Sequence, residues 1–279
     1  MSHPYSGIRA VLTTKHNKQN LVAPIFMRLG IEVIHHEWDT DQLGTFSGEV
    51  PRGKSQSETA LIKARIGMSQ KSSLYGIASE GSVGPDQALP IINSALEVIA
   101  WVDDVNGFEL IEYERGLEVV AVKGIFSKED EIDSFLLKAD FPNHALIIYP
   151  EGKKEPIYKG IRDRSELDKA IRECIAKSDK SAAVIESDLR AHMSPSRSAV
   201  IVKCAEKLVA RLTELCPSCH IPGFGEVAPL RGLACEICGD EVKSAIKGVV
   251  LGCVKCDYKI ENLNGREKVG SGNCPSCNP

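Results

Sequence analysis

The order of apolar and polar residues predicts alternating strands and helices in the first third of the chain. Apolar residues recur at helical spacing in residues 20–30 and 58–70, and Gly30 is a stop signal for the first of these helices. Short apolar runs bounded by polar loops are typical of buried strands. They predict strands within residues 8–13, 31–38 and 74–79.

The middle of the chain adds a hairpin and further mixed elements. Apolar residues run through 95–122 and are interrupted by Asp104-Val105-Asn106-Gly107, a sequence typical of a hairpin turn. Helical patterns cover 127–140, 164–178 and 196–215, and an apolar strand pattern covers 144–150. This order predicts an α/β domain with a mixed sheet over residues 1–213. Residues 214–279 have few periodic apolar segments, so we expect a small second domain that needs disulfides or bound metal to be stable.

Composition and charge restrict the class of protein. The chain has 279 residues, of which 43% are hydrophobic and 26% charged, and this mixture is typical of a globular protein with a core. It contains no apolar run long enough to span a bilayer, and its first residues lack the order of a signal peptide. We therefore expect a cytoplasmic protein without membrane contact. A net charge of -4 predicts no bulk attraction to nucleic acid.

The second domain is predicted to bind metal. Eight of the ten cysteines form four CxxC pairs, separated by 15, 14 and 17 residues. In a chain without a secretion signal, such pairs indicate zinc rather than disulfides. Eight thiolates fill two sites, so we expect two structural zinc ions in zinc ribbons. The predicted ligands are Cys216, Cys219, Cys235, Cys238, Cys253, Cys256, Cys274 and Cys277.

The spacing leaves the pairing open. Successive pairs can share a zinc ion, which is the arrangement we favour, or alternate pairs can share one in a cross-brace. A zinc ion closed by four thiolates has no open position for water, so both sites are predicted to be structural. Residues 214–279 hold seven basic and eight acidic side chains, and each zinc with four thiolates adds a formal charge of about -2. A folding staple or a protein-partner surface is therefore favoured over nucleic-acid binding.

A second candidate site lies in the first domain, where the strand pattern 74–79 leads directly into Glu80. In open α/β sheets ligands bind at the carboxyl ends of strands, and a carboxylate there can hold Mg²⁺ or Mn²⁺. Small neighbours, including Ser79 and Ser82, leave room for a ligand to approach the backbone. Glu49 and Arg52 precede the helix 58–70, which itself contributes Glu58 and Lys63.

The loop after the first strand is a candidate phosphate site. It places Thr14, Asn17 and Lys18 before the predicted start of a helix, and helix N-termini favour phosphate. Each of these segments alone is more simply a solvated loop, an ordinary helix or a capped turn. Their order and spacing together favour a site for a phosphorylated small molecule.

These segments resemble the inosine triphosphate pyrophosphatase superfamily, which includes Maf-like proteins. That superfamily has a T-x-N-x-x-K loop, an E-N-A-x-x-K-A helix and a strand that ends in acidic residues. The corresponding residues here are Thr14–Lys18, Glu58–Arg65 and Ile77–Gly81. The superfamily's late Ser-His-Arg contact resembles the segment 188–200, which contains Arg190, His192, Ser194 and Arg197. Where the superfamily often has two adjacent acidic residues, this chain has only Glu80.

The resemblance implies an activity and an assembly. It implies an ITPase-like fold, a homodimer, and Mg²⁺-dependent hydrolysis of a nucleoside triphosphate or related phosphorylated compound. Glu49, Glu58 and Glu80 would then hold the metal and orient water, while Lys18, Lys63, Arg52 and Arg197 would neutralise phosphate charge. The alternative is a non-catalytic ligand-binding module that acts through its zinc-ribbon tail.

A second resemblance extends over nearly the whole chain. The segments GTFSGEV, GIASEGSVGP, DLRAHMSPSR and CPSCHIPGFG resemble a bacterial family that is known only as a domain of unknown function. This resemblance implies no activity.

Overall fold

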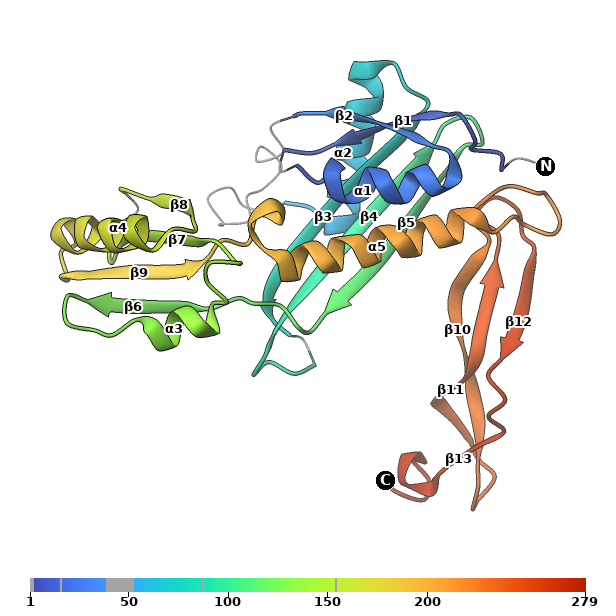
Figure 1. The fold of residues 1–279 in the computed structure, drawn as a ribbon. Coiled ribbons are helices and arrows are strands. Elements are labelled where there is room, and N and C mark those ends of the chain that lie inside the picture. Colours follow the sequence, from blue (N-terminus) through green and yellow to red (C-terminus); the bar gives the residue numbers. More distant parts are fainter. Residues whose placement is uncertain (1–2, 16, 39–52, 87, 154) are drawn as a thin grey trace. The chain divides into compact units, whose positions relative to one another are not determined.

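The computed structural model describes residues 3–15, 17–38, 53–86, 88–153 and 155–279 (Figure 1). The chain divides into two compact units. The α/β unit comprises residues 5–102 and 111–208, and the tail unit comprises residues 1–4, 103–110 and 209–279. The tail unit therefore begins close to the expected boundary at residue 213, but it also takes in the tip of the hairpin near residue 105.

The first sheet contains five strands in the order β2-β1-β3-β4-β5. Its elements are β1 (Arg9–Thr13), α1 (Gln19–Phe26), η1 (Met27–Leu29), β2 (Glu32–His36), α2 (Gln56–Lys71), β3 (Tyr75–Pro85), β4 (Asn93–Asp103) and β5 (Phe108–Gly116). Strand β1 pairs in parallel with both β2 and β3. A short turn joins β4 to its neighbour β5 and makes these two strands antiparallel, so the sheet is mixed, as predicted. The β4–β5 turn is the predicted one, and the Asp103 carboxylate accepts the Asn106 N–H at 2.8 Å.

The second sheet was not predicted from the sequence. It contains four strands in the order β6-β9-β7-β8, all antiparallel. Its strands and the remaining helices are β6 (Lys123–Ser127), α3 (Asp133–Lys138), β7 (Leu146–Pro150), β8 (Tyr158–Ile161), α4 (Arg164–Lys177), β9 (Ala182–Ser187), η3 (Ala191–Met193) and α5 (Pro195–Thr213). The helix expected from residue 127 begins only at Asp133, because the Asp130 carboxylate accepts the Ser127 N–H and closes a turn there.

Strand β3 is longer than the sequence predicted. The expected strand ended before Glu80, whereas β3 continues to Pro85. The apolar pattern stops at Ala78 because β1 ends there: Thr13 of β1 lies opposite Ala78, and β3 then continues without β1 as a neighbour. Glu80 therefore lies inside a strand, two residues beyond the carboxyl end of β1.

Helix α2 packs on one face of the first sheet. It begins with a capping box, in which the Ser55 hydroxyl accepts the Glu58 N–H and the Glu58 carboxylate accepts the Ser55 N–H. Its buried positions follow a helical period and are Thr59, Ala60, Lys63, Ala64, Gly67 and Met68. Gly67 permits close packing, since a Cβ there would collide with Thr13 of β1.

The tail unit contains a third sheet. Its strands, in the order β12-β11-β10-β13, are β10 (Gly225–Cys235), β11 (Glu241–Gly252), β12 (Lys259–Leu263) and β13 (Lys268–Val269), with η4 (Ser271–Asn273) near the end of the chain. Strands β10 and β11 form one long antiparallel hairpin. Few apolar patterns are evident in the sequence of this region. Most side chains of β10 and β11 are not buried, so apolar and polar residues do not alternate regularly along these strands.

Candidate functional site

The carboxyl end of β1 is the centre of the first candidate site. Thr14 follows β1 and is buried, with its N–H bonded to the His36 carbonyl at 3.1 Å. Strand β3 carries Ser79 and Glu80 past this point. Side chains of consecutive strand residues point to opposite faces, so these two residues present one polar group to each face of the sheet.

On the Ser79 face, three charged side chains and a hydroxyl form a buried cluster. Lys18 Nζ donates to Ser79 Oγ at 2.9 Å and lies 3.7 Å from Glu97 of β4. Arg197 of α5 donates through Nε to the other Glu97 oxygen at 2.6 Å. The exposed fractions of Lys18, Glu97 and Arg197 are 7%, 1% and 4%. Buried charges of this kind persist only when they are paired, and here two cations share one carboxylate.

Burial changes the ionisation of this cluster. It lowers the pKa of Lys18 to about 8, against the attraction of the Glu97 carboxylate. Burial also raises the pKa of the Cys204 thiol to about 12. Cys204 is therefore a neutral donor to the backbone carbonyls of Glu97 and Glu112, as expected for a buried thiol and not for a nucleophile.

On the opposite face, Lys63 of α2 forms a buried ion pair with Glu80. Both side chains are at least nine-tenths buried. Next to them, Gln56 at the start of α2 donates to Ser82 Oγ at 2.9 Å. The sequence prediction treated Lys18 and Lys63 as parts of one site. The structure brings both to the carboxyl end of β1, but on different faces of the sheet.

Arg197 is held in place by the first turn of α5. Its Nη1 donates to the Leu189 carbonyl at 2.6 Å. The neighbouring Ser196 contacts His144, whose Nε2 lies 3.1 Å from the Ser196 N–H and 2.9 Å from its Oγ. His144 Nδ1 lies 2.8 Å from the Asp140 carboxylate. This Asp-His-Ser chain caps the amino end of α5, because the same imidazole nitrogen accepts both the backbone and the hydroxyl proton.

The other predicted site residues lie in different environments. Arg190 forms a two-pronged ion pair with the buried Asp188, with contacts of 2.5 and 2.9 Å. His192 is exposed in η3, and Asn17 is exposed next to Gln19, at 3.4 Å. Glu58 is fully engaged in the capping box of α2. Glu49 and Arg52 lie outside the described residues.

Glu97 was missed by the sequence analysis. It stands between apolar residues in ALEVIAW, where a carboxylate inside a buried strand is itself an unusual signal. Glu97 occupies the room that Gly81 leaves, because a Cβ at Gly81 would collide with the Glu97 carboxylate. The second Glu97 oxygen, Oε2, has no hydrogen-bond partner among the described residues.

The eight predicted zinc ligands form two tetrads in the tail unit. Among the described residues, the groups that can hold a metal are Cys216, Cys219, Cys253 and Cys256, and Cys235, Cys238, Cys274 and Cys277. The favoured pairing of successive CxxC pairs is therefore wrong, because alternate pairs share a site. The cause is the hairpin: Gly225 lies opposite Gly252 at one end, and Ala234 lies opposite Glu241 at the other.

The two tetrads consequently lie at opposite ends of the β10–β11 hairpin. An 11-residue strand spans about 35 Å, so the two candidate metal sites are far apart. Two zinc ribbons stacked along the sequence were expected. The structure instead contains one hairpin with a tetrad at each end.

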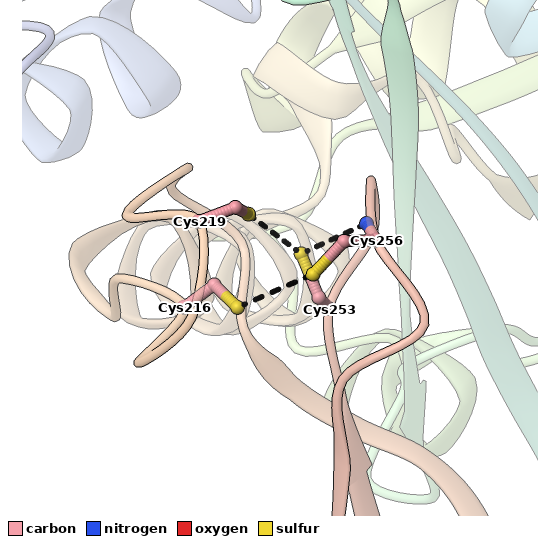
Figure 2. A group of neighbouring side chains, drawn as sticks. All are labelled: Cys216, Cys219, Cys253 and Cys256. Atoms are coloured by element: carbon pink, nitrogen blue, oxygen red, sulfur yellow. Dashed lines mark hydrogen bonds between the residues drawn. The ribbon is translucent and has the colours of Figure 1, made fainter.

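The geometry of each tetrad suits zinc. In the first tetrad, Cys216 Sγ lies 3.7 Å from Cys256 Sγ, and Cys219 Sγ lies 3.5 Å from Cys253 Sγ. Figure 2 shows the four sulfurs of this tetrad converging from two segments. In the second tetrad the corresponding distances are 3.9 and 3.6 Å. A tetrahedral site with Zn–S bonds of about 2.3 Å has sulfurs about 3.8 Å apart, so both tetrads match it.

Local backbone structure explains why CxxC pairs form these corners. Within the pairs, backbone N–H groups point at the first sulfur, as from Ser218 to Cys216 at 3.4 Å and from Lys255 to Cys253 at 3.3 Å. Such bonds stabilise thiolates. After two of the pairs the chain turns through a left-handed residue, His220 or Gly239. His220 closes this turn through its N–H and is not part of either tetrad.

The chain belongs to the family described as domain of unknown function DUF6671, which matches residues 63–279. The match confirms the resemblance to an uncharacterised family and covers both tetrads. A comparison with curated proteins found no match. None of the helices in the described part of the chain has the length and apolar character that crossing a bilayer requires.

Proposed function

We propose that the α/β unit is a Mg²⁺-dependent hydrolase of a nucleoside triphosphate or a related phosphorylated compound, of the inosine triphosphate pyrophosphatase type. The observation that carries the proposal is the buried charge at the carboxyl end of β1. Three cations, Lys18, Lys63 and Arg197, face two carboxylates, Glu80 and Glu97. Buried ammonium and guanidinium groups of this kind suit a phosphate, because they can donate charge-assisted hydrogen bonds to its oxygens.

The cations would act on the charge that shifts toward the leaving group. Phosphoryl transfer depends mainly on positioning and on electrostatic stabilisation of the transferred oxygens. Lys18 and Ser79 would donate hydrogen bonds to a phosphate on one side of β3. Lys63 would do the same on the other side, with Glu80 holding its ammonium group in position.

The carboxylates fit a divalent cation. Mg²⁺ takes oxygen ligands and is usually held by one or two carboxylates with most of its waters retained. Glu97 Oε2 is a buried carboxylate oxygen without a hydrogen-bond partner among the described residues, and it would serve a cation on the Ser79 face, whereas Glu80 would serve one on the opposite face. When bound, the cation would supply Lewis-acid stabilisation of the phosphate oxygens.

A specific observation favours a second candidate, a ligand-binding module without turnover. Each carboxylate of the cluster already has a cationic partner, Glu80 in Lys63 and Glu97 in Arg197. A carboxylate held in an ion pair is a weak base, so such a site suits recognition of a phosphate at least as well as activation of water.

The test is release of phosphate and pyrophosphate from a panel of common and deaminated nucleoside triphosphates, with Mg²⁺ or Mn²⁺ and zinc-loaded protein. Glu80→Gln should abolish turnover. Glu32→Gln is the matched control, because Glu32 is an exposed carboxylate of β2 paired with Arg9. Unchanged turnover in Glu80→Gln would contradict the hydrolase. Calorimetric nucleotide binding without release from any substrate would favour the binding module.

A further inference from the structure

A cavity lies on the α2 face of the first sheet, beyond the start of α2. Its volume is about 410 Å³, within the range of about 300–1,000 Å³ that is typical of small-molecule sites. Its lining includes Ser82, Gly84 and Asp86 of the β3 segment, Ser94 and Leu96 of β4, and Arg115 of β5.

Arg115 is the polar anchor of this cavity. Its Nε donates to the Asp86 carboxylate at 2.6 Å, and its Nη2 donates to the other oxygen of the same group. Asp86 is buried and also accepts the N–H groups of Ala88 and Leu89, both at 2.9 Å. The carboxylate therefore fixes the guanidinium plane. Arg115 Nη1 has no partner among the described residues, and the side chain is 46% exposed, so it can donate to a ligand.

The cavity continues the face that carries the Lys63–Glu80 pair. Glu80, Ser82 and Gly84 occupy alternate positions of β3, so their side-chain directions share one face of the sheet. The hydrogen bond from Gln56 to Ser82 lies between the ion pair and the cavity. From Glu80 to Gly84 the strand advances about 13 Å. A ligand with its phosphate at the Lys63 ammonium group, next to Glu80, would therefore extend along β3 into the cavity.

We infer that this cavity binds the nucleoside part of the phosphorylated ligand, with Arg115 donating through Nη1 to a hydrogen-bond acceptor on that part. This inference rests on the proposed function. The apolar side chain of Leu96 offers surface to the ring system, and Ser82 and Ser94 offer hydroxyl groups. Arg115 is thus a specificity-determining residue, and it lies away from the reacting phosphate.

Gly84 provides a direct way to fill the cavity. A Cβ at Gly84 would meet nothing within 4 Å, and its backbone is not in the left-handed region. Gly84→Phe should therefore place a phenyl ring in the cavity without a clash. The matched control is Leu137→Phe, which adds a ring at an 83% exposed position of α3. Arg115→Gln removes the anchor, and its control is Arg28→Gln in the exposed pair with Glu206.

The experiment measures binding by calorimetry of nucleoside triphosphates, inorganic tripolyphosphate and free nucleosides to the full, zinc-loaded chain. Gly84→Phe and Arg115→Gln should weaken nucleotide binding tenfold or more and leave tripolyphosphate binding unchanged, with both controls like the parent protein. Melting temperatures verify that each variant is folded.

The outcomes separate this inference from the proposed function. If nucleotide binding is unchanged in Gly84→Phe but weakened in Lys63→Met, the inference that the cavity binds the nucleoside is wrong. The proposed phosphate site at Lys63 is then still supported. If neither nucleotide nor tripolyphosphate binds, the proposed function fails. In that case free-nucleoside binding that Gly84→Phe abolishes would still support the cavity, and no nucleoside binding would overturn it.

Discussion

The α/β unit and the tail unit are stabilised by different means. In the α/β unit the fully buried Trp101 packs against Tyr5, Phe26 and Tyr75, with ring centroids 5.1 to 5.9 Å apart. In the tail unit, one buried cluster consists of Cys235, Val242 and Cys274, so two of its three members are predicted metal ligands. Burial of apolar surface holds the first unit, and we expect metal to hold the second.

This contrast explains what each unit can do. A unit with an extensive apolar core can carry the cost of buried charges such as Lys18 and Glu97, because burial elsewhere offsets it. A sheet held by two four-thiolate sites has closed metals and few buried side chains. The difference places the candidate chemistry in the α/β unit and a structural role for metal in the tail.

The largest expected effect is that of metal removal. Structural zinc contributes roughly 10 kcal/mol or more to folding of small metal domains, so a strong chelator should unfold the tail sheet. Amide hydrogen exchange should then lose protection in residues 225–263 and keep it in β1, β3 and β4. Equal loss of protection in both units would contradict the view that metal stabilises only the tail unit.

The next effect is that of Trp101→Ala in the α/β core. Removing a buried aromatic ring leaves a cavity and should lower the free energy of unfolding by about 3–5 kcal/mol. Chemical denaturation followed by circular dichroism measures it. The zinc content should be unchanged, and a variant that loses zinc together with stability would show that the two units are not separate in this respect.

A comparable or smaller loss is expected from Arg197→Met. It removes one partner of a buried pair and leaves Glu97 with Lys18 alone, which costs about 3–5 kcal/mol in typical buried pairs. The double variant Arg197→Met with Glu97→Gln should recover part of the loss, since no unpaired carboxylate remains. A double variant as unstable as the sum of the single variants would contradict coupling between the two side chains.

The smallest effect is a pH dependence, which appears only in alkaline solution. The pKa of Lys18 is about 8 in the folded chain, against 10.5 as its ordinary value. Below pH 8 both states hold the proton, whereas between about 8 and about 10.5 the unfolded state holds more of it. Stability should therefore rise with pH across this window. Lys18→Met should remove the rise, and denaturation at pH 7.5 and 10 measures the difference. An identical rise in both proteins would exclude Lys18 as its source.

Elements with strong local patterns were predictable. Helices α1, α2, α4 and α5 and strands β1, β2 and β7 lie where the apolar periodicity placed them. The predicted turn at Asp104–Gly107 joins β4 to β5. In these segments the local period and the tertiary burial agree, so the sequence alone carries the information.

The remainder depends on long-range pairing. Strands β6, β8 and β9 are short and lie next to segments with helical patterns, so their own apolar patterns were not recognised and the second sheet could not be inferred. Glu97 becomes part of the candidate site only because β4 pairs beside β3 and brings it next to Gly81. The tetrad pairing was ambiguous because the CxxC spacings fit both alternatives, and the length of the β10–β11 hairpin decided between them.

The most direct test of this contrast is the zinc content of two double variants, measured by atomic emission after gel filtration in metal-free buffer. Cys216→Ser with Cys253→Ser removes two ligands from one tetrad, whereas Cys216→Ser with Cys235→Ser removes one ligand from each. We predict two zinc ions per chain in the parent protein and one in the first variant. The second variant should lose metal from both sites. Loss of both ions in the first variant, with one kept in the second, would contradict a hairpin with a metal at each end.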